Sequence, residues 1–396
     1  MFRSLFGVNP DRLPRVSVAQ RVIDKIVANA LIYDTETGEV LFGFTLPSAE
    51  RAEPDMIVLD TIPPDDSAIR LGAMFEQGDE WQNAIFNWYE DNWRLCLQRG
   101  LDAAGKPIQP TLRTSLTHLG NWHKHPGTYT IPSEGDLATA LDDLADPEMG
   151  APQLLVFLAT VWEKLPEMPP LEELLGEDDT NEEEEPSPTL LNRLSSRLHT
   201  LRERFANDYD DEFDAHGEPE AGDWLIIPIN DTRWVRIDFW YISRTIRRFV
   251  RVHPLVLPNE SLPVLNSIGW HLANPERVRL ERDTLRAQKF TPDFKQYDTD
   301  GVPPLEICSW VWRPPSPYIL FLVTDADYPA RRPLVRITPV ALLKALANEP
   351  ELFRKLWEAS KPVPASAYPT WAWTPERTLA DLAAAVEANL LEGKMA

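Results

Sequence analysis

Two histidines, a serine and an aspartate are spaced in this sequence in a way that suits a catalytic metal ion. His123 and His125 are separated by one residue, so on a strand both rings point to the same face. Ser133 follows His125 after seven intervening residues, and Asp136 follows Ser133 after two. Two imidazoles and one carboxylate form the ligand set of a catalytic zinc, whose fourth position is left to water. The sequence therefore predicts a zinc ion (Zn2+) at His123, His125 and Asp136.

The elements expected around these residues can hold them in place. Residues 116–125 are predicted to form a strand that ends in the two histidines. Ser133 can cap a helix over residues 133–144, whose first turn carries acidic side chains. Residues 153–159 form a nearly continuous apolar run, which predicts a strand buried on both faces. Apolar periodicity further predicts a helix over residues 18–30 and strands over residues 31–33, 40–44 and 56–62.

The pattern His-x-His-x7-Ser-x2-Asp, at His123, His125, Ser133 and Asp136, resembles the JAMM (MPN+) motif of zinc metalloisopeptidases. A strand followed by a helix is also the context in which that family carries the motif. The resemblance implies that the two histidines and Asp136 bind zinc, and that the Ser133 hydroxyl donates to the tetrahedral oxyanion. It also implies a mixed sheet flanked by helices, with cytidine-deaminase-like layering.

The same family uses a glutamate before a strand of small residues, in a stretch of the type Glu-Thr-x-Gly-x-Leu-x-Gly. Residues 36–43 of this chain, Glu-Thr-Gly-Glu-Val-Leu-Phe-Gly, occupy the corresponding place. Glu39 stands where the family usually has glycine, so both Glu36 and Glu39 remain open as the base. The distance from Glu36 to Leu41 and Gly43 matches the family, and we therefore choose Glu36. The resemblance implies that Glu36 takes a proton from water and passes it to the leaving amine.

The C-terminal third resembles a ubiquitin-conjugating-enzyme (UBC/RWD-like) domain. A basic amphipathic helix over residues 275–289 is followed by predicted strands and by Tyr328-Pro329-x-x-x-Pro333, similar to the family's YPxxPP stretch. Trp373-Thr374-Pro375 before a last helix resembles the family's Trp-x-Pro. Residues 336–371 contain no cysteine, and Cys308 lies in an earlier predicted strand. The resemblance therefore implies a module that docks a modifier or a partner enzyme and forms no thioester there.

These patterns predict an α+β protein with two ordered domains. A JAMM-like metallopeptidase domain is expected over residues 1–164, and a UBC-like α+β meander domain over residues 265–396. Residues 165–223 form an acidic, Pro- and Glu-rich insertion or linker, whose like charges repel one another. A hairpin over residues 224–258 is expected to complete the first domain. A domain boundary near residue 170 is the alternative division.

Composition limits the partners and the compartment. The formal net charge is -23, which argues against nucleic acid because phosphate binding needs clustered Lys and Arg. The only cysteines, Cys96 and Cys308, lie far apart and suit a reducing cytoplasm. No apolar run approaches membrane-spanning length, and the first ten residues do not make a signal peptide. We therefore expect a cytoplasmic protein that does not bind membranes.

Together the two resemblances imply a cytoplasmic zinc isopeptidase. Its substrate would be a ubiquitin-like protein or its conjugates, and activating or conjugating enzymes would be further partners. Bacterial chains of this kind are associated, by family, with ubiquitin-like conjugation systems. Two alternatives remain open at this stage: a zinc peptidase acting on an unrelated substrate, and a non-catalytic interaction scaffold that kept the ligands.

Overall fold

The computed structural model describes residues 13–65, 67–71, 74–76, 79–147, 150–164, 224–298, 305–346, 351–368 and 371–391. The acidic segment predicted over residues 165–223 lies outside the described residues. The chain divides into two compact units, one formed by residues 1–82 and 116–262 and the other by residues 83–115 and 263–396. Both units combine helices with a sheet, so the protein belongs to the α+β class.

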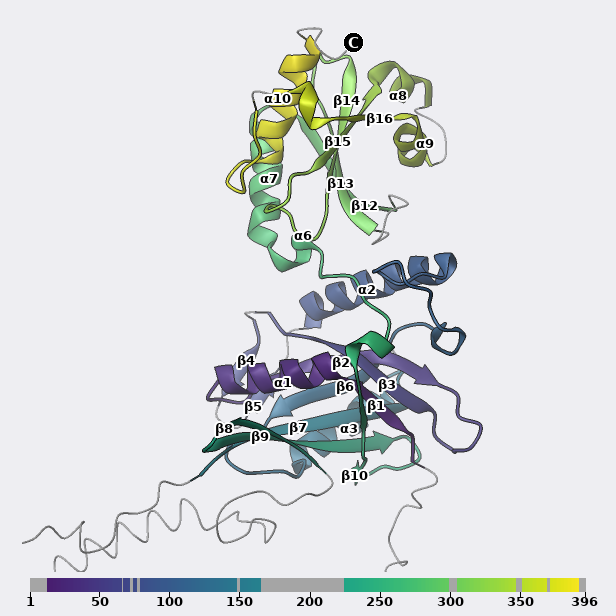
Figure 1. Cartoon of the computed structure of the whole chain (residues 1–396), viewed down its shortest axis with the longest axis vertical. Coiled ribbons are helices and arrows are strands. Elements are labelled where there is room, and N and C mark those ends of the chain that lie inside the picture. The colour runs from purple at the N-terminus through teal and green to yellow at the C-terminus, as the bar shows by residue number, and fades with distance from the viewer. Residues whose placement is uncertain are drawn as a thin grey trace, which may run out of the picture. The chain divides into compact units, whose positions relative to one another are not determined.

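The first unit is built on a mixed sheet, which Figure 1 shows from one side. Its strands follow the order β10-β9-β7-β6-β2-β3-β1-β11, and β8 pairs with β9. Parallel pairs join β6 to β7 and join β1 to both β3 and β11, whereas the remaining pairs are antiparallel. The strands span Val16–Ala19 (β1), Gly38–Leu46 (β2), Asp55–Ile62 (β3), Thr117–Lys124 (β6), Gln153–Glu163 (β7), Trp224–Asn230 (β8), Arg233–Ser243 (β9), Val250–Arg251 (β10) and Leu255–Leu257 (β11). A separate small hairpin pairs Ile69–Leu71 (β4) with Met74–Glu76 (β5).

Helices cover the sheet of the first unit. The helix α1 (Gln20–Ile32) buries Val22, Ile23, Ile26 and Ala30, which recur at helical spacing. The helix α3 (Glu134–Ala145) packs Ala140 and Leu144 against β7 and β9. Cover from both sides explains why β7, as its continuous apolar sequence predicts, is buried along most of its length.

Two sequence-based assignments at the N-terminal end are wrong. Residues 18 and 19, expected in a helix, end the strand β1, which is inserted between β3 and β11. Residues 31–33, expected as a strand, include the last turn of α1, which continues to Ile32. Val, Ile and Leu occur in both kinds of element. At residues 18 and 19 the pairing of β1 with β3 and β11 decides the outcome, whereas residues 31 and 32 extend α1, where Ile32 is exposed.

The second unit is built on an antiparallel meander in the order β12-β13-β14-β15-β16. Its strands span Thr291–Asp298 (β12), Leu305–Trp312 (β13), Tyr318–Thr324 (β14), Leu334–Pro339 (β15) and Lys361–Val363 (β16). Alternate residues of β14 face opposite sides, as expected of a strand. Leu320 and Leu322 pack in one apolar cluster with α7 (Pro275–Ala287) and α10 (Leu379–Leu391), and Phe321 and Val323 in another with α9 (Leu352–Ala359). Figure 1 shows α7 and α10 side by side and the short α8 (Val340–Leu346) near α9.

Residues 83–115 belong to the second unit, although the sequence-based division kept them in the first domain. About half of this stretch belongs to the helix α2 (Asp79–Arg99), which begins four residues before it. Trp88 of α2 joins the same apolar cluster as Trp270 of the short helix α6 (Trp270–Ala273), and its indole donates to the Ser267 carbonyl at 3.0 Å. Because a large side chain is buried there, Trp88 attaches α2 to the residues around Ser267, which lie 179 positions later in the sequence.

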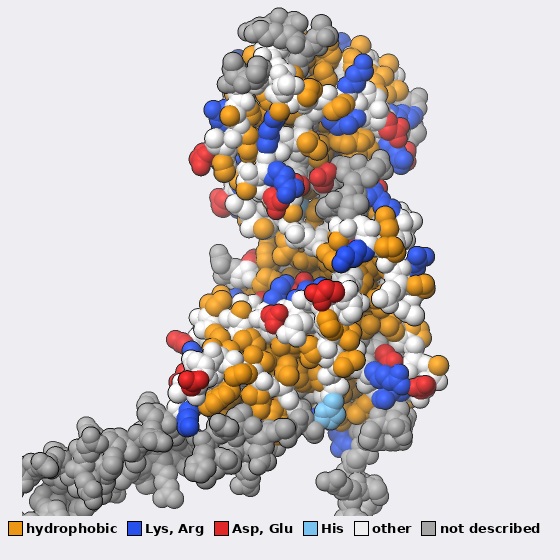
Figure 2. Space-filling model, in the orientation of Figure 1, with side chains coloured by type: hydrophobic (Ala, Val, Ile, Leu, Met, Phe, Trp, Pro, Cys, Tyr) orange, Lys and Arg blue, Asp and Glu red, His pale blue; other side chains and the backbone are white. Residues whose placement is uncertain are grey.

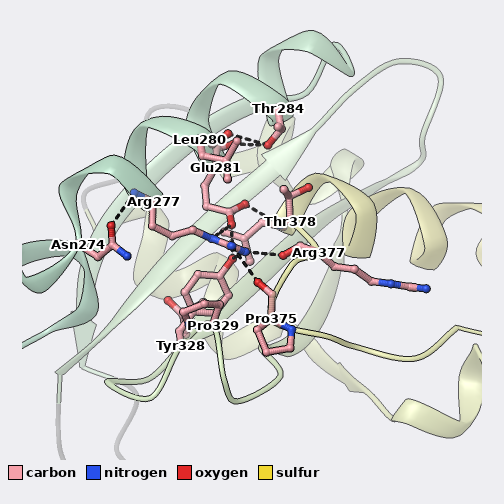
Figure 3. Close-up of polar contacts among 12 residues, drawn as sticks. Asn274, Arg277, Leu280, Glu281, Thr284, Tyr328, Pro329, Pro375, Arg377 and Thr378 are labelled. Carbon is pink, nitrogen blue, oxygen red and sulfur yellow. Dashed lines mark hydrogen bonds and ion pairs between the residues drawn. The ribbon is translucent and has the colours of Figure 1, made fainter.

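A buried ion pair joins α7 to the segment that leads into α10 (Figure 3). The Arg277 guanidinium donates to the Glu281 carboxylate at 2.6 Å, and Glu281 is fully buried. The other carboxylate oxygen accepts from the Leu379 backbone N–H at 2.6 Å. Arg277 also donates to the Pro375 carbonyl at 2.9 Å and to the Tyr328 hydroxyl at 3.1 Å. Tyr328 and Pro375 belong to two separate stretches of the chain, and Arg277 links them.

Within the described residues, every helix is too short or too polar to cross a membrane.

Candidate metal centre

The two histidines lie at the end of β6, the strand between β2 and β7. Their position is fixed from both sides, because His123 pairs with Gly38 of β2 and with Leu158 of β7. The His125 backbone N–H then donates to the Ala159 carbonyl at 3.0 Å, which continues the pairing one residue beyond the strand. Gly120 permits this close approach. It has a φ of 126°, and a Cβ at its position would lie 1.9 Å from the Leu155 carbonyl oxygen.

The structure brings the three predicted ligands together. His123 Nε2 lies 3.1 Å from His125 Nε2 and 3.2 Å from the Asp136 carboxylate, which lies 3.4 Å from His125 Nε2. Ligands held about 2.0–2.2 Å from one zinc ion stand roughly 3.0–3.5 Å apart. The three side chains therefore have the spacing of a metal site and could hold an ion. Their exposed fractions are 12%, 7% and 20%, so the cluster is largely shielded from water.

Hydrogen bonds to the far side of each ring select the tautomer that a metal needs. The Tyr129 carbonyl lies 3.1 Å from His125 Nδ1, and because a carbonyl only accepts, Nδ1 must carry the proton. The Asn121 carboxamide oxygen lies 3.1 Å from His123 Nδ1 and has the same effect. Both Nε2 atoms are then lone-pair donors that converge on one point beside a carboxylate. Such outer hydrogen bonds are usual for metal-binding histidines.

Asp136 is placed by the start of α3. The Ser133 side chain accepts from the Asp136 backbone N–H at 3.1 Å, and the Ser133 N–H donates to the Asp136 carboxylate at 2.6 Å. This capping box fixes the first turn of the helix, and thereby fixes the carboxylate beside the histidines. Burial raises the pKa of Asp136, but the adjacent His123 and His125 rings and the Ser133 N–H outweigh burial and hold the pKa well below its usual range. The carboxylate is therefore ionised throughout the physiological pH range.

The two candidate bases occupy different environments. The Glu39 carboxylate accepts from the Asn29 carboxamide at 2.7 Å and from the Trp122 indole at 3.2 Å, and only 4% of Glu39 is exposed. Glu36 is half-buried, and burial raises its pKa while His123 and His125 lower it and Asp136 raises it. Glu36 thus lies within electrostatic reach of all three predicted ligands. A carboxylate with a raised pKa beside a metal site suits a general base.

The backbone brings Glu36 to this position. The Lys124 N–H donates to the Thr37 carbonyl at 2.7 Å, so the residues before β2 run alongside the end of β6. Because Gly38 pairs with His123, the neighbouring Glu39 pairs with Trp122 and points to the other face of the sheet. Glu39 therefore points away from the predicted ligands, and Glu36 stays the candidate base that the sequence favoured.

Exposed apolar side chains border the cluster. Tyr129 and Ile131, each 56% exposed, lie in the loop between His125 and Ser133. Tyr33 is 37% exposed, and its backbone carbonyl accepts from the Lys124 ammonium group. The Arg70 guanidinium of β4 lies 4.7 Å from the centre of the Tyr33 ring. Apolar side chains that remain exposed beside a polar site often mark a binding surface.

Sequence reasoning missed Asn121 and Tyr129, the two partners of the histidine rings. Asn121 could have been found, because it lies two residues before His123 and strand alternation puts both side chains on one face. Tyr129 contributes a backbone carbonyl, which every residue type has. No pattern of side chains could have identified it.

Comparisons with known proteins add little to this geometry. No protein-family model matches the chain, and no curated protein matches it. Among solved structures, the chain is similar to the solution structure of protein DSY2949 from Desulfitobacterium hafniense, with 17% sequence identity and a TM-score of 0.24. The match covers 37% of this chain and 74% of that one.

Proposed function

We propose that this chain is a zinc-dependent isopeptidase or peptidase that removes or processes a ubiquitin-like modifier. The proposal rests on one observation: the Nε2 atoms of His123 and His125 and the carboxylate of Asp136 converge at 3.1–3.4 Å, with Glu36 in electrostatic reach. Three neutral or anionic donors aimed at one point form a catalytic metal site with an open position. The resemblance to the JAMM motif supports zinc as the metal and an isopeptide as the bond cleaved.

The residues of the proposed site have distinct roles in this reaction. His123, His125 and Asp136 would hold the zinc ion, which supplies Lewis acidity that polarises a carbonyl and makes water more acidic. Glu36 takes the proton of the attacking water and delivers it to the leaving amine. The Ser133 oxygen already accepts from the Asp136 N–H, so its own proton remains available to the oxyanion of the substrate.

The proposal also concerns the arrangement of helices and strands in the two units. In the first unit, α1 and α3 flank a mixed sheet, which is compatible with a JAMM-type domain. In the second, a helix precedes a meander, Tyr328-Pro329 lies between β14 and β15, and Trp373 precedes the last helix, as in a conjugating enzyme. Cys308 is fully buried, and burial raises the pKa of its thiol, so it cannot serve as a nucleophile.

We propose that the second unit binds the modifier or a partner enzyme, which would raise the local concentration of substrate. A protein partner suits the surface drawn in Figure 2, where Lys and Arg side chains are interspersed with acidic and apolar ones. A cytoplasmic location is part of the same proposal. Hydrogen exchange on the full-length Glu36→Gln variant with a ubiquitin-like protein should show protection within residues 263–391. Protection confined to the first unit would contradict docking.

Metal content and cleavage test the proposed activity together. We expect the purified chain to carry about one zinc ion and to release a reporter amine from the C-terminus of a ubiquitin-like protein. A chelator should abolish cleavage and added zinc should restore it. The Asp136→Asn variant should lose both metal and activity, whereas Asp142→Asn, on the exposed side of the same helix, should keep both. A wild-type protein without stoichiometric metal would overturn the proposal.

A further inference from the structure

Three tryptophans and two arginines alternate in a stack along one face of the sheet of the first unit. The Cζ atom of Arg236 lies 6.0 Å from the ring centre of Trp162 and 3.8 Å from that of Trp224. The Cζ atom of Arg251 lies 5.8 Å from the ring centre of Trp224 and 4.6 Å from that of Trp240. The stack therefore runs Trp162, Arg236, Trp224, Arg251, Trp240, and cation–π attraction acts at each step.

A single carboxylate locks both arginines of this stack. The Asp238 side chain is fully buried and accepts from Arg236 Nε at 2.9 Å, from Arg236 Nη2 at 3.0 Å and from Arg251 Nη1 at 2.7 Å. Two bonds to one guanidinium fix its plane as well as its position. Asp238 pairs with Leu158, which pairs with His123, so the stack and the first metal-site histidine lie on one face of the sheet.

The last ring of the stack holds the loop between the metal-site histidines and Ser133. The Trp240 indole donates to the Thr130 carbonyl at 3.3 Å, and both residues are buried. The preceding carbonyl, that of Tyr129, accepts from His125 Nδ1 at 3.1 Å. Two consecutive peptide groups of this loop are thus fixed, one by the stack and one by the histidine ring. Rotation of the peptide group that carries the Thr130 carbonyl would displace the one that carries the Tyr129 carbonyl, because the two groups are consecutive in the backbone.

We propose that Trp240 is a positioning residue of the metal site, and that Arg251 and Asp238 hold its indole in the donating orientation. By fixing Thr130, Trp240 keeps the Tyr129 carbonyl aimed at His125 Nδ1, and this keeps the Nε2 lone pair available to a metal. This inference rests on the proposed function, since it assigns a role toward the same metal. Among the described residues, no hydrogen bond or ion pair joins Trp240 or Arg251 to the predicted ligands, so their effect passes through the loop.

The Trp240→Phe variant removes the N–H group and keeps an aromatic face for Arg251. We expect the dissociation constant for zinc, measured by competition with a chromophoric chelator, to rise roughly 5- to 10-fold. In zinc-free protein, long-range ¹H–¹⁵N spectra of the histidine rings should show His125 mainly with the proton on Nδ1 in the wild type, and as a mixture of tautomers in the variant. A zinc affinity within twofold of wild type together with an unchanged tautomer would overturn the inference.

Trp162→Phe is the matched control, because the Trp162 indole at the other end of the stack donates to Thr160 Oγ1 at 2.8 Å instead of to the loop. It should leave zinc affinity and the His125 tautomer as they are in the wild type. A change as large as that of Trp240→Phe would contradict a specific role for the loop contact.

If Trp240→Phe does not fold, the Arg251→Lys variant tests the same inference. It keeps a charge for Asp238 but loses the flat guanidinium, and it should shift the same two measurements. The tautomer measurement needs no metal, so a wild-type protein that fails to bind zinc would refute the proposed function and still leave the positioning role testable.

Discussion

The indole of Trp122 donates to the carboxylate of Glu39 across β6 and β2, at a distance of 3.2 Å. Asn29 of α1 donates to the other oxygen of the same carboxylate at 2.7 Å. Glu39 is therefore occupied in the core between the sheet and a helix. Glu36, three residues earlier, lies within electrostatic reach of the three predicted metal ligands.

Exchanging each glutamate for glutamine should separate the two roles. Glu36→Gln removes the proton acceptor, and we expect the rate of modifier cleavage to fall by at least about 100-fold with unchanged zinc content. Glu39→Gln turns an amide N–H toward a buried donor, which should lower the free energy of unfolding by about 1–3 kcal/mol. Rates of cleavage and urea denaturation measure the two effects. The assignment is wrong if Glu39→Gln, and not Glu36→Gln, loses activity while remaining folded.

Removal of metal should destabilise the first unit. An ion that binds only the folded chain stabilises it by about 4 kcal/mol when its free concentration is 1,000 times the dissociation constant. In calorimetry we therefore expect a chelator to lower the melting temperature of one transition, and zinc to restore it. The His125→Gln variant should melt at the same temperature with and without zinc. A zinc-dependent shift that persists in His125→Gln would place the metal elsewhere.

Breaking the buried ion pair of the second unit should be costly. Glu281→Ala leaves the Arg277 guanidinium, whose side chain is 10% exposed, without its carboxylate, and removes the acceptor of the Leu379 N–H. Loss of one partner of a buried pair destabilises a protein by about 3–5 kcal/mol. Chemical denaturation measures the effect. Arg279→Ala breaks an exposed pair with Glu276 on the same helix and should change stability by less than about 1 kcal/mol.

The stability of the first unit should fall in mild acid because of His118. Burial lowers the pKa of His118 from 6.5 to about 4, and its Nδ1 atom is buried without a hydrogen-bond partner among the described residues. The unfolded chain takes up a proton below pH 6.5, whereas the folded chain does so only near pH 4. Folding is therefore penalised increasingly as the pH falls through this window, by on the order of 3 kcal/mol in all.

The His118→Phe variant isolates this contribution, because other groups titrate alike in both proteins. The difference in free energy of unfolding between the wild type and His118→Phe should be constant above pH 7 and should shift in favour of the variant between pH 6.5 and pH 4. A difference that stays constant down to pH 4 would show that His118 is readily protonated in the folded state.

The sequence by itself determined the residues of the candidate site and most of the surrounding elements. His123, His125 and Asp136 could be selected from residue type and spacing, and Ser133 as a helix cap, because the strand repeat and the helix cap are local properties of the chain. The strand β7 could be predicted from its continuous apolar residues for the same reason.

Only the tertiary structure decided that Glu39 points away from the predicted metal ligands. Glu36 and Glu39 are separated by the pairing of Gly38 with His123, a register set between strands about eighty residues apart. The short strand β1 and the place of residues 83–115 in the second unit were settled in the same way, by partners distant in sequence. The Tyr129 carbonyl and the contact of Trp240 with Thr130 also exist only in the folded chain. Backbone groups are alike in every residue, and their partners are chosen when distant segments meet.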